Sequence, residues 1–466
     1  MPVQLADLIL PEFGLPTVEP AIPASTYRLR LEALKQRARQ EGYEVFVVYA
    51  DREHFANLTY LTGYDPRFEE SLLLINLTGN GKPLILVGNE GLGYVRSSPI
   101  IDDLEVVLFQ SFSLLGQPRT TSQPLADILA LAGIKSGTRV GVAGWKHFSQ
   151  PESATSAMWL EIPSYIVDTL RQITRSPEIV RNANAILMDS SRGLRAINDV
   201  DQIAWFEFAG TYSSQALRDV LFGLKPGLTE YEAFTLTRWN GIPLSCHAML
   251  SSGERAFLGM GSPSMNRIQR GDPFTMAFGL WGGLNARAGF VVAAAAELPA
   301  GIQDYVEKLV APYFGAIVAW YERVGIGVTG GDLYDAIHTR IGDPFFGVGL
   351  NPGHLIHLDE WLHSPIYKGS TETLQSGMAL QVDVIPATGT PYFTTNIEDG
   401  LALADENLRA ELASRYPDAW ARIQARRAFM HEELGITLKP EVLPLSNIPA
   451  YLPPFLLAPS RAMRCQ

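Results

Sequence analysis

The spacing of apolar residues in the first third of the chain predicts strands alternating with helices. Between residues 26 and 40, apolar positions such as Leu31, Leu34 and Ala38 are interleaved with Arg and Lys, which predicts an amphipathic helix. Asn80-Gly81 lies between two apolar runs and is typical of a hairpin turn. Together these patterns predict an α/β domain. Its buried strands are predicted over residues 45–49, 72–75, 84–87 and 139–142.

The pattern changes after Arg175-Ser176-Pro177, where helices come first and strands follow. Helices are predicted over residues 178–196 and 201–222, and Thr229 with Glu232 has the spacing of a capping box that opens a third helix. Helices followed by an antiparallel sheet predict an α+β domain. Its later elements are predicted as strands within 250–292, a helix over 302–323 and strands within 378–404.

The predicted domains are therefore residues 1–172 and residues 173–466. The first 24 residues are rich in Pro and lack periodicity, so we expect a loose arm there. The tail, 437–466, is also rich in Pro but apolar, and we expect it to wrap around the body or a partner subunit.

Composition narrows the function classes. The formal net charge of −12 argues against nucleic acid and against an anionic membrane surface as partners, because both require a basic face. The chain has no signal-peptide pattern at its start and no apolar run of transmembrane length, so a soluble, cytoplasmic protein is expected. The two cysteines fit a reducing compartment, with Cys246 expected to be buried and inert and Cys465 to be frayed.

Six segments, in order, resemble landmarks of the creatinase/aminopeptidase P/prolidase family, the pita-bread fold of the peptidase M24 superfamily. The resemblance implies an α/β N-terminal domain followed by an α+β pita-bread C-terminal domain. It also implies a homodimer and a small-molecule or peptide-like substrate. The segments are Tyr60-Leu61-Thr62-Gly63-Tyr64, Thr174-Arg175-Ser176-Pro177-Glu178, Leu224-Lys225-Pro226-Gly227-Leu228-Thr229-Glu230, Gly353-His354-Leu355-Ile356-His357, Ser376-Gly377-Met378-Ala379-Leu380-Gln381-Val382-Asp383 and Asn396-Ile397-Glu398-Asp399.

The metal cage of that family, Asp, Asp, His, Glu and Glu, falls here on Ala277, Ala288, His354, Asp383 and Glu398. The two alanines stand eleven residues apart, which is the family's spacing for its Asp pair. A dinuclear site needs those carboxylates to compensate its charge, so we expect no metal and no other cofactor. The alternative is one residual divalent ion on His354, Asp383 and Glu398, because three ligands suffice for a catalytic zinc.

The resemblance also implies substrate-binding positions. A proton-handling His of the family falls on Met260, and a substrate-holding His falls on Trp361. His247 lies on a segment that lines the pocket in relatives; its sequence favours a buried, hydrogen-bonded histidine, and a substrate contact is the alternative. His363 belongs to a histidine-rich stretch beside the site, and Arg67 resembles a loop residue that reaches a partner's site in dimeric relatives.

Acid–base chemistry is expected from the residues that remain. His354 or His357 would serve as general base, with Asp383 or Glu398 orienting the imidazole. Arg287 is close to the vacant positions in sequence, but alternation along a strand places it on the face opposite Ala288.

Three hypotheses follow from this residue set. The first is a metal-independent hydrolase of a small C–N bonded substrate of amidine or amide type, by analogy with creatinase, which has this fold and lacks metals. The second is a non-catalytic protein that binds a ligand or a protein in the old cleft. The third is an Xaa-Pro-type peptidase with a single residual metal.

Overall fold

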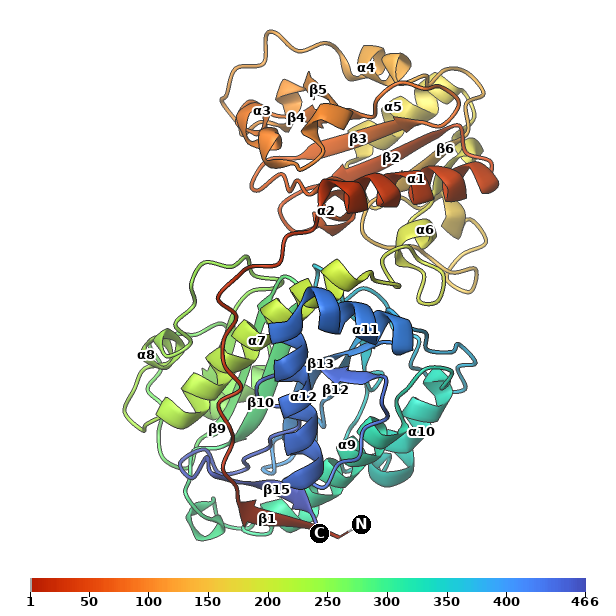
Figure 1. Cartoon of the computed structure of the whole chain (residues 1–466). Coiled ribbons are helices and arrows are strands. Elements are labelled where there is room, and N and C mark those ends of the chain that lie inside the picture. Colours follow the sequence, from red (N-terminus) through yellow and green to blue (C-terminus); the bar gives the residue numbers. More distant parts are fainter. Residues whose placement is uncertain (1) are drawn as a thin grey trace. The chain divides into compact units, whose positions relative to one another are not determined.

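A computed structural model of the chain describes residues 2–466, which form two compact units (Figure 1). The N-terminal domain is Ile22–Arg195, and the C-terminal domain combines the residues up to Ala21 with Ala196–Gln466. The sequence prediction differs, since it places the boundary after residue 172 and puts the first residues in the N-terminal domain.

The N-terminal domain is built on a six-stranded mixed sheet in the order β5-β4-β3-β2-β6-β7. β2 and β3 pair antiparallel, as do β3 and β4 across the predicted Asn80-Gly81 hairpin, whereas β6 lies parallel to β2. The sequence therefore predicts the four central strands correctly. The strands are β2 (Val45–Ala50), β3 (Ser71–Asn76), β4 (Leu84–Val87), β5 (Glu105–Leu108), β6 (Val140–Ala143) and β7 (Val180–Asn182).

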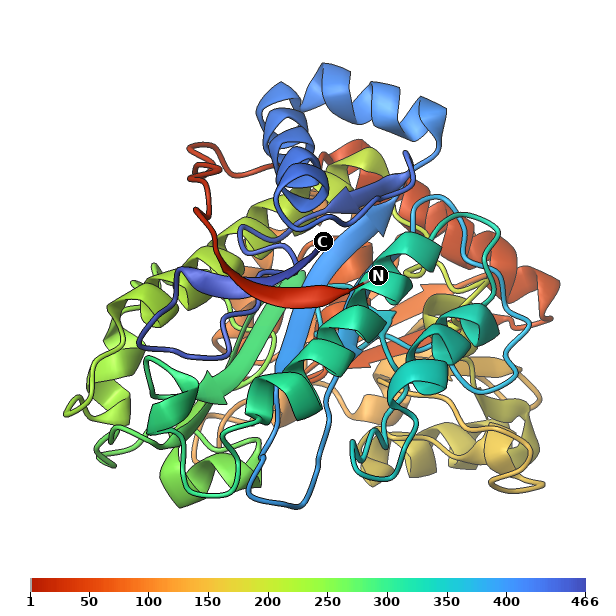
Figure 2. The same cartoon turned by 90° about the horizontal axis from the view of Figure 1, so that it is seen from below.

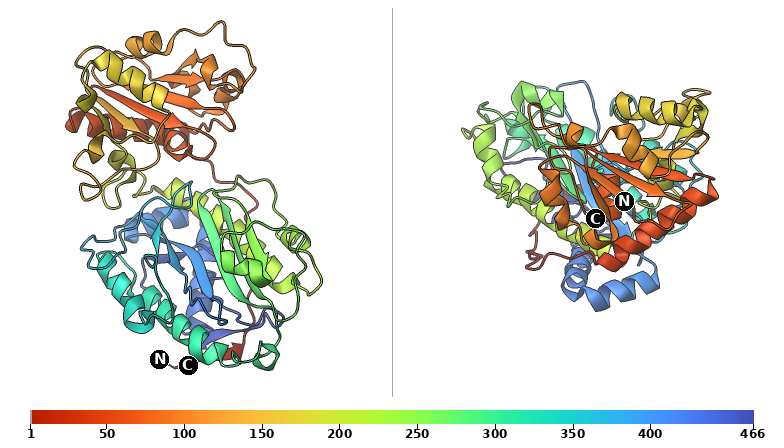
Figure 3. Two further views of the ribbon diagram at one scale, coloured as in Figure 1. Left: turned by 180° about the vertical axis from the view of Figure 1, so that it is seen from behind. Right: turned by 90° about the horizontal axis from the view of Figure 1, so that it is seen from above.

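Helices cover both faces of this sheet, as the views from front and behind show (Figures 1 and 3). Side chains of α4 and α5 share one apolar core with the side chains of β2 and β3. The helices are α1 (Ala24–Gln40), α2 (Ala56–Thr62), α3 (Gly91–Tyr94), α4 (Leu125–Leu131), α5 (Ser164–Thr174) and α6 (Ala185–Met188).

The helix predicted over residues 178–196 is wrong. Val180–Asn182 instead forms β7, which adds to the sheet parallel to β6, and only the short α6 follows it. The pairing of β7 with β6 is a contact between segments about 40 residues apart, and it overrides local propensity.

The C-terminal domain is built on a seven-stranded antiparallel sheet in the order β11-β12-β13-β10-β9-β8, with β14 pairing to β13. A two-residue turn, Trp281-Gly282, joins β9 to β10, and Gly282 has the positive φ of +96° that such a tight hairpin requires. The strands are β8 (Met249–Ser252), β9 (Pro273–Leu280), β10 (Gly283–Phe290), β11 (His354–Leu355), β12 (Ala379–Val384), β13 (Asn396–Leu403) and β14 (Val442–Pro444).

Helix α7 packs on β9 and β10 on one face of this sheet. Gly210 of α7 and Gly283 of β10 allow the close approach, since a Cβ on Gly283 would lie 2.6 Å from the Gly210 backbone. Ser213 of α7 donates a hydrogen bond to Asn285, so the odd-numbered residues of β10 face this helix. The helices are α7 (Val200–Gly223), α8 (Glu230–Thr235), α9 (Ala311–Arg323), α10 (Gly330–Ile341), α11 (Glu406–Arg415) and α12 (Pro417–Glu432).

The two ends of the chain pair with each other in the C-terminal domain. β1 (Val3–Asp7) and β15 (Arg461–Cys465) form a two-stranded antiparallel sheet, visible from below in Figure 2. The loose arm and the frayed Cys465 are therefore both wrong predictions, and Cys465 is 2% exposed. Neither strand has a strong apolar pattern in its own sequence. Each is stabilised by pairing with the other, across almost the whole length of the chain.

The tail packs against the body of its own domain. β14 pairs with β13, and the residues from 442 to 456 are buried. Over residues 2–466, no helix combines the length and the apolar character that crossing a membrane would require.

Candidate functional site

The register of four strands places the predicted cage positions on one face of the sheet. Directly paired residues of antiparallel strands point to the same face. Asp383 pairs with Glu398, Glu398 with Ala286, and Ala286 with Ala277, so these residues form a row across β12, β13, β10 and β9. Ala288, two residues beyond Ala286, shares this face. The row is acidic at one end, at Asp383 and Glu398, and carries only methyl side chains at the other, at Ala286 and Ala277.

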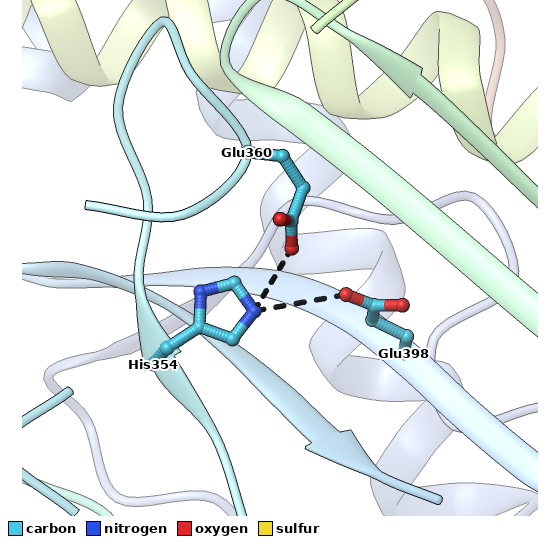
Figure 4. A group of neighbouring side chains, drawn as sticks. All are labelled: His354, Glu360 and Glu398. Atoms are coloured by element: carbon cyan, nitrogen blue, oxygen red, sulfur yellow. Dashed lines mark ion pairs between the residues drawn. The ribbon is translucent and has the colours of Figure 1, made fainter. Parts of the chain in front are cut away.

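His354 stands at the acidic end of this row. Its Nε2 lies 3.1 Å from Oε1 of Glu360, 3.7 Å from Oε1 of Glu398 and 3.8 Å from Oδ2 of Asp383. Figure 4 shows the Glu360 and Glu398 carboxylates converging on this one nitrogen from different segments. The structure thus brings together three of the residues predicted to carry the chemistry, His354, Asp383 and Glu398.

Both nitrogens of the His354 ring face acceptors. Nδ1 lies 3.2 Å from the carbonyl oxygen of Leu355, while Nε2 faces the carboxylates. The ring is fully buried, and the Trp361 indole stacks on it with a centroid distance of 4.1 Å and an interplanar angle of 21°. Trp361 therefore covers the imidazole instead of replacing the family histidine as a hydrogen-bonding group.

Burial and mutual repulsion control the charges of this cluster. Burial alone would lower the pKa of His354, but the carboxylates of Glu360, Glu398 and Asp383 outweigh it and raise that pKa well above its ordinary value. Burial raises the pKa of Asp383 to about 6, against the opposing effect of His354. Burial and the neighbouring Asp383 charge raise the pKa of Glu398 to about 8. At neutral pH the favoured state is thus a cationic His354 beside a protonated Glu398.

A cavity of about 370 Å³ lies beside Glu398, over the methyl end of the row. Ala277, Ala286 and Thr275 line it from β9 and β10, and Glu398 and Asn396 line it from β13. Its remaining lining is largely apolar and comes from residues 249–260 and 385–394. The cavity therefore lies on the side of Glu398 that carries Ala286 and Ala277.

The opposite face of the same strands carries a buried ion pair. Nη2 of Arg287 lies 2.8 Å from Oδ2 of Asp399, and both side chains are 1% exposed. The guanidinium also donates to the carbonyl oxygens of Ile448 and Tyr451. Arg287 therefore points away from the cavity, as alternation along the strand predicts, and joins the sheet to the C-terminal tail.

His357 and His363, two other predicted site residues, differ in their surroundings. His357 is fully buried, with its ring edge-on to Phe206 at 5.4 Å, and so lies within the core beside α7. His363 is half-buried, and its backbone carbonyl accepts from the amide of Leu355 next to His354. Their roles in chemistry stay predictions.

His247 and Met260 lie next to each other. The His247 Nε2 is 3.0 Å from the Met260 carbonyl oxygen, and Met260 lines the cavity while remaining 69% exposed. His247 is exposed, so the expectation that it is buried is wrong. Cys246 beside it is half-buried, and burial followed by the Glu360 and Glu398 charges raises the pKa of its thiol to about 12. That thiol is therefore un-ionised, in line with the inert role expected of it.

Arg67 belongs to the N-terminal domain, where it has a positive φ of 59° and donates to the Tyr94 hydroxyl. Its side chain also lies 3.3 Å from Asp65. These contacts account for its conformation within that domain, and its predicted role toward a partner's site stays a prediction.

Sequence reasoning missed two residues that complete the cluster. Glu360 makes the shortest contact with His354, and Gln381 donates a hydrogen bond of 2.6 Å to Oε1 of Glu398. Gln381 could have been found from its position two residues before Asp383 on the same strand, which puts both on one face. Glu360 lies on an irregular loop, where no periodicity indicates the direction of its side chain.

The residues present do not fit the dinuclear metal centre that this fold implies. Ala277 and Ala288 offer no ligand atom, and the space beside Ala277 is an apolar-lined cavity. His354, Glu360 and Glu398 do form a group whose ligand atoms all lie within 4.8 Å of one another. These residues could hold one ion, with the chemistry of a mixed nitrogen and oxygen donor set.

Comparison with known proteins identifies the family of the N-terminal domain. Residues 30–173 match the Creatinase/Prolidase N-terminal domain family. No curated protein matches the chain in sequence.

Solved structures extend the likeness to most of the chain. A recombinant prolidase from Thermococcus sibiricus superimposes with a TM-score of 0.63 at 17% identity, covering 82% of this chain and 95% of that one. The Xaa-Pro dipeptidase from Bacillus anthracis gives 0.60 at 16% identity, covering 82% and 96%. The X-Pro aminopeptidase from Thermotoga maritima gives 0.59 at 18% identity, covering 80% and 95%.

The fold is therefore that of the prolidases and X-Pro aminopeptidases. The chain carries a creatinase/prolidase N-terminal domain followed by a C-terminal domain of pita-bread architecture. At identities below 20% these similarities establish the fold alone, because one fold can host different chemistries.

Proposed function

We propose that this protein is a metal-independent hydrolase of a small C–N bonded substrate, with its acid–base chemistry on Glu398, His354 and Asp383. The observation that carries the proposal is the cavity beside Glu398. It is lined by Ala277, one of the two alanines that fall on the family's Asp positions, and the three remaining cage positions are assembled beside it.

Protons can replace the charge of a metal in this cluster. Three buried or half-buried carboxylates need positive charge nearby, because an uncompensated buried charge costs several kcal/mol, on the order of 3–5 for a broken buried pair. The raised pKa of His354 supplies an imidazolium, and the raised pKa of Glu398 supplies a neutral carboxylic acid. Nδ1 and Nε2 of His354 both face acceptors, which suits a doubly protonated ring.

Glu398 is the member of the trio that lines the cavity. In the proposed reaction a water molecule adds to the substrate carbon, the C–N bond breaks, and the departing nitrogen receives a proton. Glu398 gives that proton to the nitrogen and recovers one from the attacking water. His354 and Asp383 act through Glu398, since they set its protonation state from behind, and they are positioning residues in this scheme.

Turnover of a panel of small amides and amidines, with and without EDTA, tests the proposal. We expect hydrolysis that survives EDTA and is lost in Glu398→Gln. His354→Gln should shift the pH profile of kcat in addition to reducing kcat, which a purely structural histidine would not do. His431→Ala, an exposed histidine on α12, is the matched control and should change neither. Activity abolished by EDTA, or retained in full by Glu398→Gln, would refute the proposal.

A single-metal hydrolase is the second candidate, and one observation favours it. A tetrahedral zinc with bonds of about 2.0–2.1 Å places its ligand atoms about 3.3–3.4 Å apart. The separations of 3.1–3.8 Å between Nε2 of His354 and the three carboxylates are close to that value. The Nδ1 contact with a backbone carbonyl is also the arrangement that metal-ligating histidines adopt.

Metal analysis by mass spectrometry separates the two candidates. The protein should be purified without chelator and without metal-affinity resin. Stoichiometric metal, together with activity that zinc restores after EDTA, would select the single-metal hydrolase. Metal-free protein with full activity would select the proposed mechanism. Metal-free protein with no turnover on the panel would leave a non-catalytic binding protein, consistent with a His354 ring sealed beneath Trp361.

A further inference from the structure

The walls of the cavity beside Glu398 indicate what it binds. Its floor consists of small side chains, Ala277, Ala286 and Thr275, on neighbouring strands. Its far walls contain sulfur and aromatic side chains, Met260, Phe257 and Phe393 among them. A floor without bulk beneath aromatic walls suits a flat, apolar body, since small residues allow close approach and aromatic faces supply contact area.

One aromatic wall is already formed. Phe393 has a positive φ of 62°, which is a strained conformation for a non-glycine residue. The Thr388 hydroxyl donates a 2.8 Å hydrogen bond to the Phe393 carbonyl across the loop that joins β12 to β13. The ring of Phe393 packs edge-on against Phe257 at 5.0 Å. The loop therefore holds Phe393 against the cavity at a conformational cost, and a ligand need not order it on binding.

The ionisable groups at the wall of the cavity and directly behind it are mainly acidic. Among the described residues that line it, none is Lys, Arg or His, and Glu398 is the one ionisable group. Behind Glu398 lie Asp383 and Glu360, with His354 as the imidazole between them. A ligand carboxylate would be buried without a cationic partner, so the site excludes it. A ligand cation would take the place of the proton that Glu398 otherwise holds, pair with the resulting carboxylate and supply positive charge to the acidic cluster.

We propose that the cavity binds a small cation of the amidinium class joined to an apolar, carboxylate-free body. The planar amidinium would pair with Glu398 through two parallel N–H donors. The body would lie over Ala277 and Ala286 against the Phe257 and Phe393 rings, whose faces also favour a nearby cation. The substrate class rests on the proposed hydrolase function, but the binding claim is tested without turnover.

Three isosteric probes isolate the charge of the ligand. Benzamidine, benzamide and benzoate share one ring and one planar head group, and they carry a positive, neutral and negative charge at pH 7. Isothermal titration calorimetry of each with the whole protein should show benzamidine binding about 10- to 100-fold more tightly than benzamide, the factor expected for a charge-assisted hydrogen bond. Benzoate should show no saturable binding. Equal binding of the three, or a preference for benzoate, would overturn the proposal.

Variants locate the probe in this cavity. Glu398→Gln keeps the shape of the side chain and should remove most of the preference for benzamidine over benzamide. Ala277→Leu fills the floor and should abolish binding of both, whereas Ala300→Leu makes the same change at an exposed alanine and should leave binding unchanged. Benzamidine binding that is untouched by Ala277→Leu would place the ligand elsewhere and refute the assignment.

The ligand class and the hydrolase function can be refuted independently of each other. Benzamidine binding at Glu398 with no hydrolysis of any amide or amidine would support this ligand class and refute the hydrolase. EDTA-resistant hydrolysis of neutral amides without benzamidine binding would support the hydrolase and refute the ligand class.

Discussion

Asp399→Asn tests how firmly the buried ion pair beneath the site holds the sheet together. Asp399 accepts hydrogen bonds from Arg287, from the Asn285 amide, from the Ser446 hydroxyl and from the Ala450 backbone amide. The substitution leaves the Arg287 guanidinium, 1% exposed, without a counter-charge. Removing one partner of a buried pair costs about 3–5 kcal/mol.

The loss should appear in the free energy of unfolding measured by urea denaturation. We expect Asp399→Asn to lower it by about 3–5 kcal/mol, most of which comes from stranding Arg287. The double variant Arg287→Met with Asp399→Leu removes both charges and should lose less than Asp399→Asn alone. The control is Glu411→Gln, because Glu411 pairs with Arg415 at the surface, with exposures of 50% and 42%. That change should cost at most about 0.5 kcal/mol.

Two results would refute this reasoning. If Asp399→Asn cost less than about 1 kcal/mol, the pair would be accessible to water, since surface pairs contribute that little. If the double variant were less stable than Asp399→Asn, the network would stabilise the fold directly, and desolvation would not be the dominant cost.

Three further predictions follow from the site and its surroundings. Glu398 has a pKa raised to about 8 in the folded protein, so folding becomes less favourable as pH rises from its unfolded pKa near 4.5 through 8. In metal-free protein, Glu398→Gln should therefore match the wild-type Tm at pH 4 and exceed it by several °C at pH 9. An equal or lower Tm at pH 9 would contradict this prediction. Ala277→Asp combined with Ala288→Asp should raise the bound manganese measured by mass spectrometry after dialysis, and a metal content unchanged from wild type would show that the remaining cage is misplaced. Arg218 is 8% exposed and donates hydrogen bonds to the backbone carbonyls of Leu10 and Pro11 in the N-terminal arm. Arg218→Ala should therefore lower the free energy of unfolding, measured in urea, by about 1.5–3 kcal/mol. A loss under about 0.5 kcal/mol would mean that the arm packs without the Arg218 side chain.

The local patterns of the sequence were sufficient for most individual elements. α1 and α7 have an apolar face with helical spacing, β2, β3 and β4 are short continuous apolar runs, and the capping box of Thr229 and Glu232 at α8 is satisfied by reciprocal hydrogen bonds. These elements depend on contacts between near neighbours or on a continuous apolar face, which single-sequence patterns record. The alternation rule likewise predicted the direction of Arg287, because the period of a strand is fixed by its backbone geometry.

Only the tertiary structure decided which segments complete the sheets and the cluster. β7 and the β1–β15 pair gain their hydrogen bonds from strands far away in sequence, and so local propensity could not indicate them. The contact of Glu360 with His354 depends on the path of a loop, and the exposure of His247 depends on the surroundings of its segment. The sequence by itself predicted, through its resemblance to the family, that Ala277 and Ala288 fall on metal positions. The cavity beside Glu398 depends on strand register and on the Phe393 loop, which arise only when segments more than a hundred residues apart pack together.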